Sequence, residues 1–435
     1  MGAMGTILKK SLAGVTTVAT TAALLAGAAG TPAGAAPPPK ITTVITDLDS
    51  PRGLTFDRHG NLYVAESGTA GEGPIGLTQT GRVSKFQARS MDLLWTAQFS
   101  SLYEIQDPSQ PTFVLGPEGL SSLGKGCRGR HDCPISMIMS MSRDGILAHT
   151  GGAIDAPELG LLYEIDRATG AATATAEVGN QQYAWTLENP NPLGPPDSNP
   201  FGVLVTRDED SGRIRTFVAD AGANTVVEVE PDGTTRVIAA IPNDPIAQAT
   251  PTCVAQGPDG ALYVATLSLV TNFVFGGGAS SVWRIDPDAD HPTPPQLWAT
   301  GLTTVTACTF DRSGNFWATE MFGPTFTAPP FGDLVRISFN HPTRLKRLGG
   351  GGVLPMPGGI AQGPDGAMYV TVDTAGAESA GRVVRFADRA NSGVSPGAAG
   401  GDPDGEPAGV GTWAAAAGPA APVVGWRRHR RAGLR

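Results

Sequence analysis

One phrase recurs along this chain and restricts its fold more than any other feature. The clearest copies are GLTFDRHGNLYVAES from Gly53, CVAQGPDGALYVATL from Cys253, ACTFDRSGNFWATEM from Ala307 and GIAQGPDGAMYVTVD from Gly359. Each copy runs from apolar residues through an Asp, Pro and Gly turn into β-forming residues, which is the pattern of a β-hairpin. Recurrence of such a unit indicates a repeat architecture.

Two weaker copies fill the gap between the first and second of these. They are IMSMSRDGILAHTGG, which we expect to turn at Gly145, and NPFGVLVTRDEDSGRIRTFVADAG from Asn199. A third apolar segment follows every copy, as in GRVSKFQ from Gly81 and GRVVRFAD from Gly381, and some copies have a fourth. The sequence therefore predicts an all-β fold, a six-bladed β-propeller with four antiparallel strands per blade, over residues 36–390.

The ring also has a predicted closure. The last copy lacks an obvious fourth strand, while KITTVITDL from Lys40 reads as a strand with no hairpin partner before it. We expect residues 41–48 to be the outer strand of the last blade, which removes two unpaired sheet edges.

Composition excludes several other classes of protein. The chain has 58 Gly and 37 Pro residues among 435, too many for a long helical protein. Its formal net charge of −9 argues against nucleic acid or an anionic membrane surface as a partner. A small molecule, a glycan or another protein is the partner class left open, and we expect a monomer.

The two ends of the chain differ from its body. Residues 1–35 have Lys9 and Lys10, then an apolar segment and the A-x-A-like site Ala33-Gly34-Ala35, which predicts a secretory signal peptide and a secreted, extracellular protein. An uncleaved anchor is the alternative, and no later transmembrane span is expected. Residues 391–435 are rich in Gly, Pro and Ala and end in a basic cluster, typical of a disordered tail or a degenerate cell-surface sorting tail.

Export permits disulfides, and the chain has four cysteines. Cys127 and Cys133 bracket the short loop CRGRHDC, which favours a local disulfide over a metal site that uses His131. Cys253 and Cys308 lie near the starts of successive inner strands, one position apart on the glycine alignment. They are disulfide candidates, with buried free thiols as the alternative.

Carboxylates gather at one position of the repeat. The residues that follow the second strand of each unit are Glu66, His149, Asp220, Thr266, Glu320 and Asp373. If the units are equivalent, the four carboxylates converge around the channel axis, where Ca²⁺ is a candidate ion and His149 a candidate base. The alternative is that each carboxylate accepts hydrogen bonds from the loop N–H groups beside it.

The loops that enter the inner strands supply secondary candidates. These loops carry Pro before the strand, and their polar residues are Arg52, Asp197, Ser198 and Asn199. Ligand contact and Asx-turn capping are both open for them. No nucleophile elbow, H-E-x-x-H, P-loop or dinucleotide fingerprint occurs in the sequence.

Several strings also resemble a known family. SPRGLTFDRHGNLYVAESG, FVADAGANTVVEVEPDG, PTCVAQGPDGALYVATL and PGGIAQGPDGAMYVTVD are similar to the ScyD/ScyE family of secreted propeller proteins, over roughly residues 41–388. The turns themselves are shared with NHL and gluconolactonase-like propellers. The resemblance implies a six-bladed propeller and export, and it implies no reaction and no functional residues.

Two functions follow as hypotheses. The first is an exported binding or scaffold propeller that holds a ligand or partner on its channel face. The second is a metal-dependent hydrolase of the lactonase or lyase type that uses the ring of carboxylates. A tightly bound divalent ion would favour the second.

Overall fold

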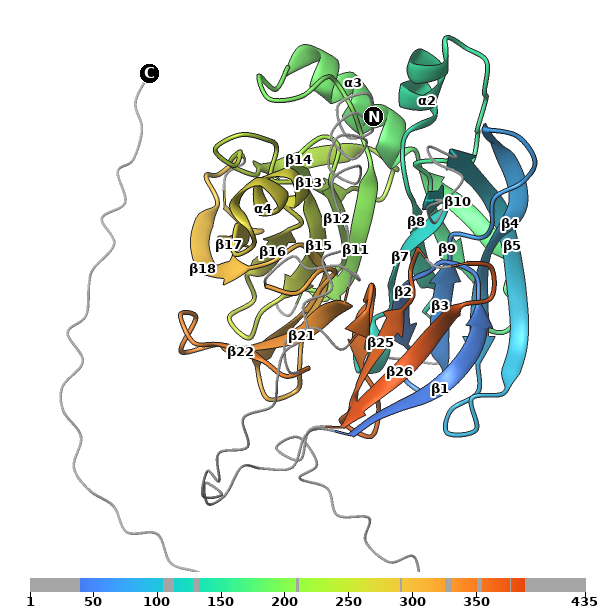
Figure 1. Ribbon diagram of the computed structural model, residues 1–435, viewed down its shortest axis with the longest axis vertical. Coiled ribbons are helices and arrows are strands. Elements are labelled where there is room, and N and C mark those ends of the chain that lie inside the picture. Colours follow the sequence, from blue (N-terminus) through green and yellow to red (C-terminus); the bar gives the residue numbers. More distant parts are fainter. Residues whose placement is uncertain are drawn as a thin grey trace, which may run out of the picture. The chain divides into compact units, whose positions relative to one another are not determined.

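A computed structural model describes residues 40–104, 113–127, 133–208, 211–289, 292–324, 331–349, 354–375 and 377–387. The described residues form six antiparallel sheets, which are the blades of a β-propeller (Figure 1). The predicted fold is confirmed. The predicted signal peptide, the C-terminal tail and His131 lie outside the described residues.

Blades 1 to 3 occupy the first half of the described chain. Blade 1 consists of β2 (Pro51–Phe56), β3 (Leu62–Glu66), β4 (Ile75–Phe86), β5 (Leu93–Glu104) and β6 (Phe113–Leu115). Blade 2 consists of β7 (Pro117–Ser121), β8 (Ile135–Met139), β9 (Leu162–Ile165) and β10 (Ala172–Ala176). Blade 3 consists of β11 (Pro200–Arg207), β12 (Ile214–Asp220), β13 (Thr225–Val229) and β14 (Thr235–Ala240).

Blades 4 to 6 follow in the same order. Blade 4 consists of β15 (Pro251–Gln256), β16 (Leu262–Thr266), β17 (Ser280–Ile285) and β18 (Gln296–Leu302). Blade 5 consists of β19 (Val305–Phe310), β20 (Asn315–Glu320), β21 (Phe331–Ser338) and β22 (Leu345–Arg347), with β23 (Leu354–Pro355) beside β21. Blade 6 consists of β24 (Ile360–Gln362), β25 (Met368–Val372), β26 (Gly381–Ala387) and β1 (Lys40–Leu48).

Blade 6 closes the ring as predicted. Strand β1 pairs antiparallel with β26, from Lys40 opposite Ala387 to Leu48 opposite Gly381. Figure 1 shows the two strands side by side, one from each end of the described chain. The first described strand and the last one therefore belong to one sheet.

The second strand of each blade is the centre of the core. Every residue of β3, β8, β16 and β25 is buried. A strand buried along its whole length has both of its faces covered, and in a propeller the neighbouring blades cover them. This explains why LYVAE and LYVAT lack the polar alternation of a strand with one face in water.

The recurrent turn has two forms, each fixed by one aspartate. In the form DRHGN, Asp57 accepts hydrogen bonds from the backbone N–H of His59 and Asn61 and from the Tyr63 hydroxyl. In the form GPDGA, Asp259 accepts hydrogen bonds from the Tyr263 hydroxyl and from Arg284 of the third strand. The aligned turn glycines have φ between +77° and +83°, where glycine is favoured; they are Gly60, Gly260, Gly314 and Gly366.

One weak copy of the repeat differs from its predicted structure. The hairpin predicted to turn at Gly145 is instead strand β8 followed by the helix α2 (Arg143–Thr150). The Ser142 hydroxyl accepts a hydrogen bond from the Gly145 N–H as the N-cap, and Gly151 ends the helix in the left-handed conformation. Capping at both ends favours the helix over a turn. The true first strand of blade 2 is β7.

The remaining helices lie in the loops between strands. Helix α3 (Val178–Glu188) connects blades 2 and 3, and α4 (Leu269–Phe275) lies between β16 and β17, while the 3₁₀ helix η2 (Gly124–Gly126) lies in the first hairpin of blade 2. Since α2, α3 and α4 all lie in loops at the starts of inner strands or the ends of second strands, they occupy one face of the propeller. No helix in the described part of the chain is long and apolar enough to cross a membrane.

Candidate functional site

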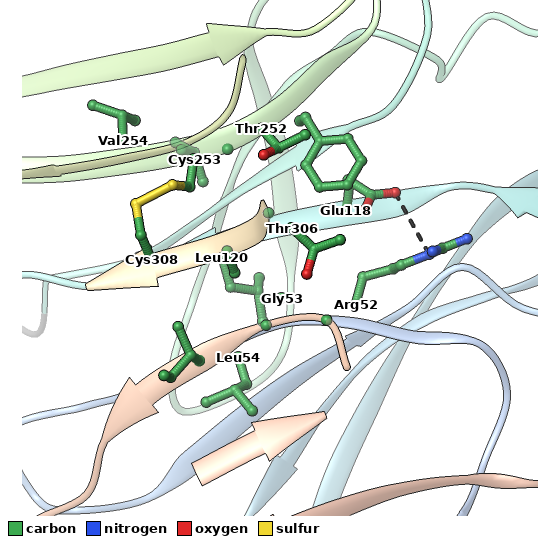
Figure 2. A pocket seen from close by; sticks show the side chains of 18 of the residues that line it. Arg52, Gly53, Leu54, Glu118, Leu120, Thr252, Cys253, Val254, Thr306 and Cys308 are labelled. Carbon is green, nitrogen blue, oxygen red and sulfur yellow. Dashed lines mark ion pairs between the residues drawn. A yellow bond between two sulfur atoms is a disulfide. The ribbon is translucent and has the colours of Figure 1, made fainter. Parts of the chain in front are cut away.

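The inner strands of all six blades surround one cavity on the propeller axis. The cavity has a volume of about 80 Å³, and its lining comes from the first residues of β2, β7, β11, β15 and β19 and from the residues that enter β24 (Figure 2). One residue of each blade occupies the same position of the lining, directly after the first residue of the inner segment: Arg52, Glu118, Phe201, Thr252, Thr306 and Gly358. The cavity therefore lies at the channel mouth, on the face that the sequence predicted for a ligand.

Glycines allow the inner strands to lie close together. A Cβ atom on Gly53 would lie 2.6 Å from the Glu118 carbonyl oxygen, and one on Gly119 would lie 2.5 Å from that of Phe201. Gly202 and Gly359 have the same relation to the next blade, at 2.7 and 2.5 Å from the carbonyl oxygens of Thr252 and Arg52. Only a residue without a side chain fits at such a distance, so these glycines determine the width of the channel.

A disulfide connects the inner strands of blades 4 and 5. Cys253 and Cys308 are bonded, with their Cα atoms 5.7 Å apart, and both line the cavity. The alternative of two free thiols is thereby excluded. The bond lies where the series of glycine contacts is interrupted, because blade 4 has Cys253 at the position of Gly202.

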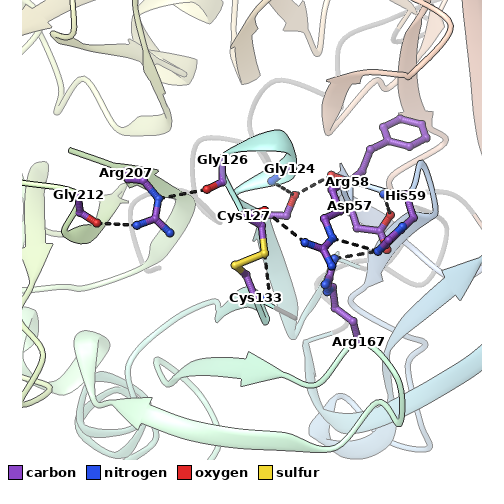
Figure 3. Close-up of a disulfide and its surroundings, with 12 residues drawn as sticks. Asp57, Arg58, His59, Gly124, Gly126, Cys127, Cys133, Arg167, Arg207 and Gly212 are labelled. Carbon is purple, nitrogen blue, oxygen red and sulfur yellow. Dashed lines mark hydrogen bonds and ion pairs between the residues drawn. A yellow bond between two sulfur atoms is a disulfide. The ribbon is translucent and has the colours of Figure 1, made fainter. Parts of the chain in front are cut away.

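The second predicted disulfide is also present, away from the channel mouth. Cys127 and Cys133 are bonded within the first hairpin of blade 2, at the opposite end of the strands. Figure 3 shows arginines from both neighbouring blades beside this loop: Arg58 donates to the Cys127 carbonyl oxygen and Arg207 to that of Gly126. The disulfide therefore belongs to a contact among three blades.

Arg52 and Glu118 are the two charged residues of the cavity lining. Arg52 Nε lies 3.7 Å from Glu118 Oε2, and the residues are 9 % and 3 % exposed. Arg52 Nε also donates to the Ser67 hydroxyl at 3.1 Å, and Nη2 donates to the Val114 carbonyl oxygen at 3.0 Å. Two of the three guanidinium nitrogens thus hold the side chain in place.

Glu118 has fewer partners than its burial would suggest. Its carboxylate accepts no hydrogen bond from the described residues, and the Arg52 ion pair is longer than a hydrogen bond. Burial raises the pKa of Glu118 to about 7, and the positive charge of Arg52 opposes the rise. A buried carboxylate with unused acceptor capacity beside a cavity makes this position a candidate binding site.

Hydroxyl groups complete the lining. Thr252 Oγ1 donates to the Val305 carbonyl oxygen at 2.7 Å, and Thr306 Oγ1 donates to that of Pro357 at 2.9 Å. Each hydroxyl proton is therefore used to connect one blade to the next. The Thr252 hydroxyl oxygen keeps acceptor capacity for a ligand, while Thr306 Oγ1 also shares a hydrogen bond with Thr319 Oγ1 at 3.0 Å.

The predicted carboxylates Glu66, Asp220 and Glu320 share one position in their blades. Each lies opposite the first residue of its inner strand, as Glu66 does opposite Pro51. Each accepts a hydrogen bond from a backbone N–H of the loop that enters that strand: Asp49 for Glu66, Asn199 for Asp220 and Thr303 for Glu320. Their geometry matches the alternative in which each carboxylate binds its own loop.

Further local partners surround these three carboxylates. Glu66 pairs with Arg82 at 2.9 Å, and Glu320 pairs with Arg347 at 2.7 Å. Burial raises the pKa of Asp220 to about 6, opposed by hydrogen bonds from Ala223, Ser198 and Asn199. No group of three or more His, Cys, Asp or Glu side chains among the described residues is arranged to hold a metal ion. The predicted Ca²⁺ site stays a prediction for a metal measurement.

Asp373 and His149 lie elsewhere. Asp373 follows Val372, which is the residue opposite Arg382, so it is one position beyond the equivalent of Glu66. It pairs with Arg382 at 2.5 Å. His149 is exposed in the last turn of α2, because the segment that carries it is a helix and not a second strand.

The secondary candidates fall into two groups. Arg52 lines the cavity, as described above. Ser198 Oγ donates to Asp220 at 2.6 Å, the Asn199 side chain accepts from the Met141 N–H at 3.0 Å, and Asp197 accepts from the Ser198 N–H. Burial raises the pKa of Asp197. These three residues therefore hold in place the loop that leads into the first strand of blade 3.

Glu118, Phe201 and both cavity threonines are not among the site residues predicted from the sequence. A signal was available, because Pro117-Glu118-Gly119 repeats the pattern of Pro51-Arg52-Gly53 and Pro200-Phe201-Gly202. The hairpin predicted to turn at Gly145 leaves this segment outside the repeat, so the first strand of blade 2 is not predicted from it.

Comparison with known proteins gives no family for the chain. No family model matches it, and no curated protein matches it. Among solved structures, a luciferin-regenerating enzyme is similar at 12 % identity, with 81 % of this chain and 96 % of that chain covered and a TM-score of 0.45. A putative gluconolactonase is similar at 14 % identity, with 82 % and 93 % covered and a TM-score of 0.43. Regucalcin from Agrobacterium tumefaciens, a calcium-binding protein, is similar at 14 % identity, with 79 % and 95 % covered and a TM-score of 0.41. Likenesses of this level do not indicate a shared activity or ligand.

Proposed function

We propose that this protein is an exported propeller of the ScyD/ScyE type that binds a small ligand at the mouth of its central channel. The observation that carries the proposal is the buried Glu118 carboxylate, which borders the cavity beside Arg52 and accepts no hydrogen bond from the described residues. Leaving buried acceptors unused costs stability, and a ligand that donates to Glu118 recovers that cost.

Two further features support the proposal. The glycine contacts and the disulfide hold the channel wall in one shape, and a preformed wall reduces the entropy lost on binding. The disulfides Cys127–Cys133 and Cys253–Cys308 support export, since such bonds persist in oxidising compartments. The similar strings quoted above support the family.

A ligand screen tests the proposal. The secreted full chain would be screened by ligand-observed NMR against neutral, anionic and cationic small molecules, beside Glu118→Gln and Arg52→Lys. Binding that either substitution weakens supports the proposal. Glu228→Gln is the control for a buried carboxylate outside the site, because Glu228 pairs with Arg213, Arg215 and Arg236 and does not line the cavity. Binding that is equal in all four proteins, or absent throughout, overturns it.

A further inference from the structure

We propose, resting on the function above, that the Arg52–Glu118 pair selects a neutral amide head group whose N–H and C=O lie on the same side. Primary carboxamides, lactams and ureas have this arrangement. The carbonyl oxygen would accept from the Arg52 guanidinium, and the N–H would donate to the Glu118 carboxylate. The juxtaposition of one buried donor and one buried acceptor at the cavity carries the inference.

The spacing of the pair suits such a group. In a planar amide the oxygen and the nitrogen are about 2.3 Å apart, from the ordinary C=O and C–N bond lengths. Arg52 Nε and Glu118 Oε2 are 3.7 Å apart, too far for a hydrogen bond with each other. One amide can therefore bridge the guanidinium and the carboxylate, and its carbonyl oxygen would accept from Nη1, because Nε already donates its single hydrogen to the Ser67 hydroxyl.

The guanidinium retains a donor for this contact. Its Nε and Nη2 hold Ser67 and Val114, while Nη1 donates to none of the described residues. Nε lies nearer to Glu118, and Nη1 is the nitrogen with unused hydrogens. A planar guanidinium fixes the direction of these hydrogens, which gives the contact its geometry.

Charge argues for a neutral ligand. Arg52 and Glu118 are the only charged residues of the lining within the described chain, and above pH 7, where Glu118 is ionised, their charges cancel. An anion would be repelled by Glu118 and a cation by Arg52. Both repulsions are stronger in this buried site than in water, because the surroundings screen charge less. A neutral amide satisfies both residues and leaves no new buried charge.

The amide geometry excludes an ordinary peptide bond. In a trans secondary amide the N–H points away from the C=O, so one group cannot reach both residues. Lactams and primary amides keep an N–H on the oxygen side. With about 80 Å³ available, the cavity takes a head group and not a whole large molecule.

The test uses matched small probes on the secreted full chain. By calorimetry or NMR titration at pH 8, we expect 2-pyrrolidone and propionamide to bind at least about tenfold more tightly than N-methylpyrrolidone and N-methylacetamide, which lack the required N–H. Glu118→Gln should lower 2-pyrrolidone affinity by about tenfold, the lower end for a hydrogen bond to a charged group. The same variant should gain affinity for propionate, since Arg52 is then unbalanced. Glu228→Gln should leave all affinities unchanged.

The pH dependence separates the amide from an acid. An amide donates to charged Glu118, so its affinity should rise by about tenfold from pH 6 to pH 8, because only the ionised fraction binds. A carboxylate that binds beside protonated Glu118 should weaken over the same range. Glu118→Gln should remove either dependence.

The outcomes are distinguishable. Preference for the lactam that depends on Glu118 supports the amide inference. Tight binding of propionate or methylammonium by the unsubstituted protein, with no lactam preference, overturns the inference and leaves the ligand-binding function standing. If no probe binds and the wider screen also finds no ligand that depends on Arg52 or Glu118, both proposals fail.

Discussion

The guanidinium of Arg52 and the carboxylate of Glu118 face each other across 3.7 Å at the channel mouth, although they come from the inner strands of two different blades. Each residue follows a proline and precedes a glycine that contacts the next blade. Their approach is therefore a product of blade packing.

Glu118 should make the stability of the protein depend on pH. Its folded pKa of about 7 lies above the ordinary 4.5, so the folded state binds the proton more tightly. The cost of ionising the buried carboxylate lowers the free energy of unfolding. This cost is absent below pH 4.5, grows as the pH rises to 7 and is constant above pH 7. Glu118→Gln removes it, so the free energy of unfolding of the variant relative to the parent should increase by about 2–3 kcal/mol between pH 5 and pH 8. Urea unfolding at the two values measures this, and an unchanged difference would contradict the assigned burial.

Loss of the two disulfides should have unequal effects. Cys253–Cys308 closes a loop of 55 residues and Cys127–Cys133 one of 6. The entropy of loop closure predicts that the free energy of unfolding falls by about 4 kcal/mol without the first bond and by about 2 kcal/mol without the second. Paired Cys→Ala variants, compared by urea midpoint, check the order. A larger loss for the short loop would show that its contacts with Arg58 and Arg207 outweigh loop closure.

The glycines of the channel wall should not tolerate a methyl group. A Cβ on Gly119 would lie 2.5 Å from the Phe201 carbonyl oxygen, within backbone that cannot yield without moving a blade. We expect Gly119→Ala to cost at least about 2 kcal/mol. Gly126→Ala is the control, because its nearest neighbour would be 3.9 Å away. Equal melting temperatures for the two variants would contradict close packing of the inner strands.

Removal of metal should leave stability unchanged. The carboxylates of Glu66, Asp220 and Glu320 have local donors that balance them without an ion. We expect equal melting temperatures of the full chain with and without EDTA. One equivalent of Ca²⁺ in protein purified without chelator, with a lower melting temperature after chelation, would restore the ring of carboxylates as a metal site.

Export has a direct check. The A-x-A-like site predicts cleavage after Ala35, so N-terminal sequencing of the secreted protein should begin at Ala36. A chain that retains residues 1–35 and sediments with membranes would instead support the uncleaved anchor.

The fold is predictable from the sequence because short turn sequences specify each hairpin and recur in most blades. Aspartates at positions such as Asp57 and Asp259 act on residues a few places away, so each copy carries its own structure. Blade 2 departs from the predicted repeat because Ser142 and Gly151 cap a helix where the other blades have a turn. The shared position of Glu66, Asp220 and Glu320 is predictable from the repeat. The role of these carboxylates is not, because it depends on hydrogen bonds from the loop beside each strand.

The channel site could not be predicted from one repeat alone, because it depends on how neighbouring blades pack. Glu118 and Arg52 are distant in sequence, and only ring packing sets their separation. Asp373 is a different case, because its offset is visible in the sequence. It lies seven residues after the turn glycine Gly366, whereas Glu66 lies six residues after Gly60, and the pairing of β25 with β26 agrees with this count.

The pairing of β1 with β26 has a consequence for how the protein is made. The first described strand to leave the ribosome has its partner in the last, so blade 6 stays incomplete until Ala387 is synthesised. Until then β1 and the growing sheet edge are both open to wrong pairing. A chain that stops short of β26 lacks more than one strand, because the outer strand of the same blade then has nothing to bind.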